Sequence, residues 1–102
     1  MEERKVITME ELETIMTAKT GVFDASSADT YSFSVDLVGT GVHFDKSAIS
    51  GEYLCMILLV GNSEIQIEPV IIENIYLDND GTIMIEFNNN LPDLEIKYRR
   101  KI

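Results

Sequence analysis

The stretch ENIYLDNDGTIMIEF, residues 73–87, decides the fold because it is compatible with two hairpin registers and favours one of them. A two-residue Asp-Gly turn would place Ile75 opposite Glu86. A three-residue loop ending at Gly81 places Ile75 opposite Ile85 instead. A slip of one residue moves every side chain to the other face of a sheet. Since the second register keeps the isoleucines together, it predicts a type I turn with Gly81 in the left-handed region and a bulge.

The preceding segment, YLCMILLVGNSEIQIEP (residues 53–69), predicts a second hairpin. Gly61 and Asn62 would form its two-residue turn. The expected pairs are then Val60 with Ser63, Leu58 with Ile65, and Met56 with Ile67. Residues 53–60 are apolar at every position, which predicts a central strand or one covered on both sides. Pro69 has no N–H for a ladder, so it would end or bend the second strand.

A further strand is predicted over residues 94–99, where apolar and polar side chains alternate. Its apolar residues would face the preceding strand, with Leu94 opposite Phe87, Ile96 opposite Ile85, and Tyr98 opposite Ile83. The outer face of this meander would hold Asn74, Tyr76, Met84, Glu86, Glu95, Lys97 and Arg99. Either the helix covers Tyr76 and Met84, or they form an apolar patch with a basic rim.

The first half of the chain predicts one helix and two strands. The helix is expected over residues 9–19, where Thr8 and Glu11 fit a capping box. Alternation over residues 31–37 predicts a strand with one buried face. Residues 39–41, Gly-Thr-Gly, would break that strand, and the segment after them would return as a short partner. Residues 20–29 and 45–52 are expected to be irregular.

Together these elements predict a single α+β domain over residues 1–102. One N-terminal helix would pack on an antiparallel sheet of five or six strands, arranged as a meander of hairpins. The pattern leaves open whether the sheet stays open or partly closes into a barrel, which would remove its exposed edges. A chain of this length has room for one core.

The charge of the chain limits its partners. Eighteen Asp and Glu residues oppose eight Lys and Arg residues, for a net charge of −10. Four of the basic residues lie within residues 97–101, so residues 1–96 carry 18 acidic and 4 basic side chains, or −14. Such a surface repels nucleic-acid phosphates and anionic membranes and attracts basic partners. We therefore expect no direct nucleic-acid binding and no membrane binding.

The sequence predicts a cytoplasmic protein. Residues 1–5, MEERK, lead into no apolar core of a signal peptide. The longest unbroken apolar run is residues 53–60, eight residues, whereas a membrane helix needs about 20. Cys55 is the only cysteine, so no internal disulfide forms, and a reducing compartment is the simplest expectation.

No motif predicts catalysis, a cofactor or a metal. His43 and Cys55 are the only residues of their kinds, and Cys55 lies in the most apolar run, where a thiol is a packing group. Residues 78–81, Asp-Asn-Asp-Gly, are typical of a turn. A calcium loop built on their glycine would put Tyr76 and Phe87 at positions that need carboxylates. We therefore expect a protein that is not an enzyme.

Outward-facing carboxylates give the strongest functional indication. Strand residues two positions apart are separated by about 6.6 Å, of the same order as successive phosphates in a nucleic acid. We expect a non-enzymatic binding module, of the inhibitor or immunity type, that docks on a basic protein surface such as that of a nucleic-acid-processing enzyme. The expected contact residues are Glu64, Glu68, Glu73, Glu86, Tyr76 and Met84. The alternative is a structural or assembly subunit that forms a homo-oligomer, such as a homodimer, through its sheet edges.

Overall fold

The computed structural model describes residues 4–19, 22–27, 36–88 and 91–99. Its elements along the chain are β1 (Arg4–Val6), α1 (Met9–Thr17), β2 (Val22–Ser27), β3 (Asp36–Lys46), β4 (Tyr53–Val60), β5 (Ser63–Ile67), the 3₁₀ helix η1 (Pro69–Ile71), β6 (Ile72–Asp78), β7 (Ile83–Phe87) and β8 (Leu94–Arg99). Within these residues the eight strands form one antiparallel sheet in the order β1-β6-β7-β8-β2-β3-β4-β5. The sheet is open, with β1 at one edge and β5 at the other.

The predicted α+β class is confirmed, but the prediction of five or six strands is wrong. Of the two alternatives that the sequence left open, the sheet is open and does not close into a barrel. Neither β1 nor β2 is predicted from the sequence. β1 has three exposed residues, too few to show alternation. β2 lies inside a stretch predicted to be irregular, yet it pairs with β8 and β3 and buries Phe23 and Ala25. Its small and polar residues carry little strand signal on their own.

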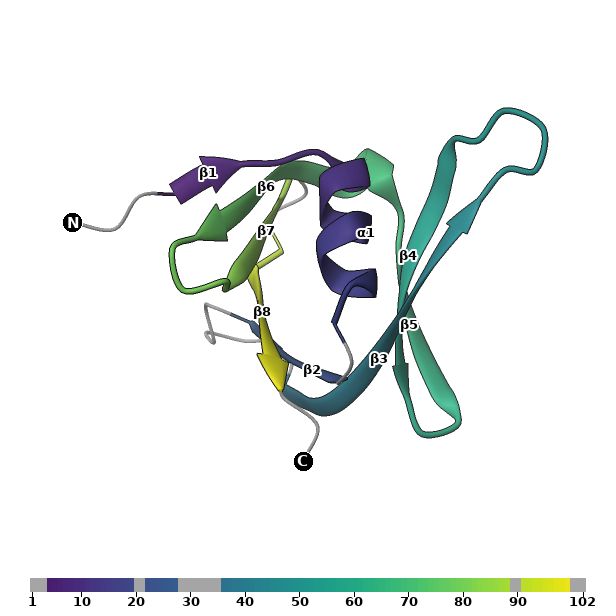
Figure 1. Cartoon of the computed structure of the whole chain (residues 1–102). Helices are drawn as coiled ribbons and strands as arrows, with labels where there is room; N and C mark the ends of the chain where they lie inside the picture. Colours follow the sequence, from purple (N-terminus) through teal and green to yellow (C-terminus); the bar gives the residue numbers. More distant parts are fainter. Residues whose placement is uncertain (1–3, 20–21, 28–35, 89–90, 100–102) are drawn as a thin grey trace.

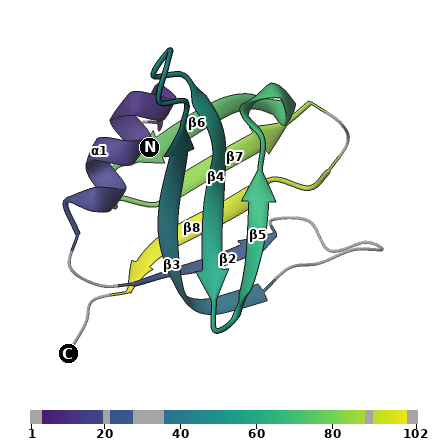
Figure 2. The same ribbon diagram turned by 90° about the vertical axis from the view of Figure 1, so that its right-hand side faces the viewer.

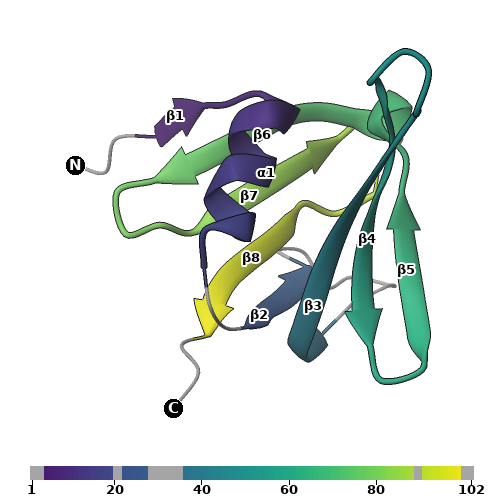
Figure 3. The same ribbon diagram turned by 45° about the vertical axis from the view of Figure 1, so that its right-hand side comes forward.

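The sheet bends back on itself, so that two of its parts face each other (Figures 1 and 3). We call these parts the β6–β8 half and the β3–β5 half. In Figure 2 the strands of the β3–β5 half cross in front of those of the other half. α1 lies between them at one side (Figure 1). The buried core between the halves consists of Ile7, Leu12, Met16, Phe23, Ala25, Phe44, Met56, Leu58, Ile67, Ile75, Ile83, Ile85, Leu94 and Ile96.

β3 connects the two halves through β2, which pairs with both β3 and β8. The first residues of β3 pair with β2, and the residues from Gly41 onward pair with β4. Gly39 adopts a φ of 73° and forms a bulge against β2, where its N–H donates to Asp24 Oδ1 at 3.0 Å. The prediction that the glycines break the strand is therefore wrong: a bulge bends a strand without ending it. Residues 31–35 lie outside the described residues.

The β6–β7 hairpin confirms the register predicted from residues 73–87. Ile75 pairs with Ile85, and Leu77 pairs with Ile83. Gly81 has a φ of 87°, and its N–H donates to the carbonyl of Asp78 at 3.0 Å. The isoleucines point into the core, whereas Tyr76 and Met84 pair on the opposite face.

The β4–β5 hairpin also has its predicted register. Val60 pairs with Ser63, Leu58 with Ile65, and Met56 with Ile67. Pro69 begins η1, two residues after β5 ends. β4 lies between β3 and β5, as expected for an apolar strand, with Met56 and Leu58 facing the core.

The last strand, β8, has the predicted bounds but a different register. Leu94 pairs with Ile85, and Ile96 pairs with Ile83, two residues away from the predicted pairing. The shift is even, so every side chain keeps its predicted face. Six residues separate β7 from β8, so no two- or three-residue turn fixes their register. Alternation predicts which face each side chain occupies, but it does not predict which residues pair.

The capping box at the start of α1 is confirmed. The Glu11 N–H donates to Thr8 Oγ1 at 3.1 Å, and the Thr8 N–H donates to Glu11 Oε1 at 3.0 Å. The helix ends at Thr17, two residues earlier than predicted. Leu12 and Met16 are its buried residues and belong to the core.

A pair of neighbouring truncations tests these face assignments. Ile85→Ala should lower the free energy of unfolding by about 2–5 kcal/mol, because Ile85 is fully buried and its loss leaves a cavity. Met84→Ala should cost about 1 kcal/mol or less, because Met84 lies partly exposed on the opposite face. Urea denaturation measures both. Equal losses would contradict the assignment.

Candidate functional site

β5 is one of the two edge strands of the sheet. It pairs with β4, and no described strand runs along its other side (Figure 3). Its side chains alternate between the two faces of the sheet. Glu64 and Gln66 point outward, opposite Leu59 and Ile57 of β4. Ile65 points inward.

Three carboxylates gather on the outer side of the β3–β5 half. Asp45 pairs with Cys55 across β3 and β4, Glu64 belongs to β5, and Glu68 follows β5. Burial raises the pKa of the Cys55 thiol, and the charges of Asp45, Glu64 and Glu68 raise it further. We call Asp45, Glu64 and Glu68 the acidic face.

Asp45 and Glu64 of the acidic face lie across from the two ends of an apolar strip on β4. Cys55, Ile57 and Leu59 lie on this outer face, and their exposure rises from 8% at Cys55 and Ile57 to 41% at Leu59. An apolar centre with a charged rim is a common arrangement in protein interfaces.

The described ion pairs do not involve the carboxylates of the acidic face. The ion pairs among the described residues are Arg4 with Asp78 at 3.2 Å, Lys5 with Glu11 at 4.0 Å, Lys46 with Glu13 at 3.1 Å, and Lys97 with Glu95 at 3.2 Å. Lys19 lies over the ring of Tyr98. In this part of the chain, none of these cations neutralises the acidic face.

The acidic face is a poor setting for a nucleophilic thiol. His43 pairs with Ile57, so it lies diagonally across from Cys55 on the same face. A reactive cysteine needs a lowered pKa, which nearby positive charge provides. Here burial and three carboxylates raise the pKa of Cys55 and keep it a neutral thiol.

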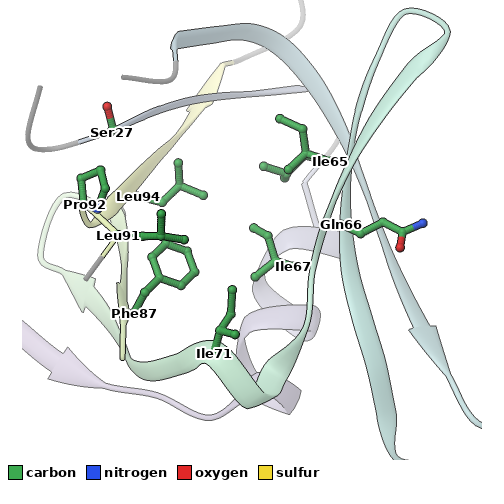
Figure 4. Close-up of a pocket in the computed structure, with 10 residues that line it drawn as sticks. Ser27, Ile65, Gln66, Ile67, Ile71, Phe87, Leu91, Pro92 and Leu94 are labelled. Atoms are coloured by element: carbon green, nitrogen blue, oxygen red, sulfur yellow. The ribbon is translucent and has the colours of Figure 1, made fainter. Parts of the chain in front are cut away.

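A groove of about 180 Å³ opens on the inner side of β5 (Figure 4). Its walls are Leu58, Ile65 and Ile67 of the β3–β5 half, Ile71 of η1, and Phe87, Leu91, Pro92 and Leu94 on the other side, with Ser27 and Gln66 at its border. In Figure 4 the apolar side chains converge on the groove, whereas Gln66 points away from it. Ile65 and Leu91 remain 39% and 41% exposed.

The size of the groove limits what it binds. Small-molecule sites usually span about 300–1,000 Å³ and contain several converging polar groups. A cavity of about 150 Å³ takes up one benzene molecule. This groove is therefore suited to one apolar side chain of a partner.

The predicted contact residues are divided between two surfaces. Glu64 and Glu68 lie at β5, whereas Glu73, Glu86, Tyr76 and Met84 lie on β6 and β7 in the facing half of the sheet. The helix leaves Tyr76 and Met84 uncovered, because it packs on the isoleucine face. Glu86 accepts hydrogen bonds from Asn74 at 2.8 Å and Tyr76 at 3.4 Å. Arg4 covers the Tyr76 ring at 5.1 Å.

Neither the position of Asp45 nor the groove is predicted from the sequence. Alternation along residues 41–46 places Asp45 and His43 on one face. The sequence-based prediction instead ends the short strand before residue 45 and makes residues 45–52 irregular. The groove combines β5 with the segment around Leu91, which is distant in sequence. No local pattern reveals such a pairing.

A second polar cluster fastens α1 to the β3–β4 hairpin. Tyr53 OH donates to Glu13 Oε1 at 2.6 Å, and Lys46 Nζ lies 3.1 Å from the same oxygen. The hydrogen bonds from Tyr53 and Lys46 hold the pKa of Glu13 below its usual value. The bond to Glu13 raises the pKa of Tyr53 to about 12. Tyr53 therefore stays neutral and acts as a structural donor.

This cluster predicts a late-titrating tyrosine. Tyr53 should ionise near pH 12, and Glu13→Gln should move its pKa down toward 10. Because the folded pKa lies above the unfolded one, this stabilisation is complete below pH 10 and is lost as the pH rises toward 12. The tyrosinate absorbance of the wild type minus that of Tyr53→Phe isolates the titration. Glu52→Gln is the control, and an equal shift there would contradict the assignment.

Cys55 reports directly on the acidic face. Replacing Glu64 and Glu68 with glutamine should lower the pKa of the thiol and speed its reaction with a disulfide reagent at mildly alkaline pH by about two- to fourfold. The control carries Glu10→Gln and Glu52→Gln, which remove the same charge elsewhere. An unchanged rate in the first variant would show that the carboxylates do not converge on Cys55.

No helix in residues 4–19, 22–27, 36–88 and 91–99 is long and apolar enough to cross a membrane. The same residues contain no cluster of three or more His, Cys, Asp or Glu side chains suited to a metal ion. Comparisons with protein-family models, curated proteins and solved structures found no match to this chain.

Proposed function

We propose that this protein is a non-enzymatic module that binds a basic protein surface through its acidic face. The observation that carries the proposal is the position of Asp45, Glu64 and Glu68 on one outer side of the sheet, beside an apolar strip, while the described ion pairs involve other carboxylates. Unpaired charge of one sign accelerates association with an oppositely charged partner. The apolar strip on β4 would supply the contact area that desolvates on docking.

The proposal narrows the interface expected from sequence. Glu64 and Glu68 remain in it, and Asp45 joins them. Glu86 lies on β7 in the facing half of the sheet, together with the other residues expected on β6 and β7. Glu73, Tyr76 and Met84 therefore form no part of this docking surface.

A nucleic-acid-processing enzyme is the partner class that we favour. Its phosphate-binding groove is basic, and spaced carboxylates imitate phosphates in charge and separation. An inhibitor or immunity-type role follows, because occupation of that groove would exclude the nucleic acid. A free, neutral thiol at Cys55 also suits a reducing, cytoplasmic setting.

Affinity capture with matched charge variants tests the proposal. Immobilised wild-type protein should retain basic proteins from an extract of the cells that produce it, and added salt should release them. The Glu64→Gln and Glu68→Gln double variant should lose these proteins by about tenfold, whereas the Glu10→Gln and Glu52→Gln control should keep them. Equal retention by the two variants, or retention independent of salt, would defeat the proposal.

A further inference from the structure

We propose that the edge of β5 that pairs with no described strand binds an extended segment of the partner, in which basic and apolar residues alternate, as an additional strand of the sheet. We call it the free edge of β5. The inference rests on the proposed function and specifies the partner's chemistry. Three features of β5 support it: the direction of its backbone groups, the groove on its inner side, and the carboxylates on its outer side.

The backbone of β5 presents hydrogen-bonding groups to the open side. Val60 and Ser63 close the two-residue turn and form a hydrogen-bonded pair, after which hydrogen-bonded and non-hydrogen-bonded pairs alternate along the hairpin. Glu64 and Gln66 therefore occupy non-hydrogen-bonded positions relative to β4. Their N–H and C=O groups point toward the free edge, where an added strand would lie about 4.8 Å away.

The two faces of β5 differ in chemistry, so an added strand needs an alternating sequence. Inward side chains of that strand would lie beside Ile65 and at the mouth of the apolar groove, which holds about one side chain. Outward side chains would lie beside Glu64, Gln66 and Glu68, where positive charge is favoured. Main-chain bonds would then provide affinity, and alternate side chains would provide specificity.

A second copy of this chain fits the same edge poorly. Antiparallel pairing of two β5 strands would bring Glu64 and Glu68 of both copies onto one outer face. Like charges on neighbouring strands are destabilising. The other edge, β1, is only three residues long, and its Arg4 and Lys5 already form ion pairs with Asp78 and Glu11 of the same chain. Charge complementarity therefore favours a basic partner strand over self-association.

Fluorescence anisotropy with three synthetic peptides and the full chain tests this inference. The first peptide is of strand length and alternates lysine and valine. The second has the same composition with the lysines in one block. The third repeats the alternating sequence with N-methyl groups on alternate amides, on the edge that would face β5. The alternating peptide should bind at least about tenfold more tightly than either of the other two, because only it combines the side-chain pattern with free N–H donors.

A matched pair of variants tests the backbone separately. Gln66→Pro removes an N–H that points to the open side, a position where an edge strand tolerates proline. It should weaken binding of the alternating peptide by at least about tenfold, with the circular dichroism spectrum retained. Gln66→Ala keeps the N–H and should stay within about twofold of the wild type. If Gln66→Pro fails to fold, the N-methylated peptide provides the decisive comparison.

The outcomes separate this inference from the proposed function. Equal affinities for the alternating and N-methylated peptides would overturn edge pairing, even where Glu64→Gln and Glu68→Gln still weaken salt-dependent binding. Unchanged peptide binding in that double variant would instead overturn electrostatic docking. A sedimenting dimer that Gln66→Pro converts to a monomer would assign the edge to a second copy and overturn the peptide proposal.

Discussion

Burial of one apolar sheet face is the constraint on which this structure depends. A helix of nine residues covers only a small part of an eight-stranded sheet, so most of the inner face has to be covered by the sheet itself. The core therefore joins Met56 of one half to Ile85 of the other, with Leu12 of α1 beside them. Each apolar side chain buried in this way contributes about 1.5–3 kcal/mol, which outweighs any single surface ion pair.

The bend that buries this face also creates the exposed edge. Gly39 forms the bulge in β3, and β3 passes from one half to the other without leaving the sheet. β5 then approaches the facing half through apolar side chains instead of backbone hydrogen bonds, which leaves the groove. An exposed edge is an aggregation risk that proteins usually counter with charge. On β5, outward glutamates would serve both purposes: they oppose self-pairing and favour a basic segment.

Charge is distributed unevenly for a structural reason. Several of the described cations link elements of the fold. Lys46 pairs with Glu13, which also accepts a hydrogen bond from Tyr53. Arg4 pairs with Asp78 and lies over the Tyr76 ring. Carboxylates near β5 have no such partners among the described residues. The carboxylates beside β5 form none of the described ion pairs, and on the proposed function their charge would attract a basic partner.

The sequence by itself determined the local features: the capping box at Thr8, both hairpin registers, and the face to which each of their side chains points. These follow from short-range chemistry, because turn residues and a period of two act within a few positions. It did not determine the number of strands, the register of β8 or the grouping of the carboxylates. Those depend on which distant segments lie together once the sheet bends. Only tertiary structure could therefore place Glu64 and Glu86 in different halves of the sheet, put Asp45 and Glu64 on the same outer face, and place the groove beside the edge of β5.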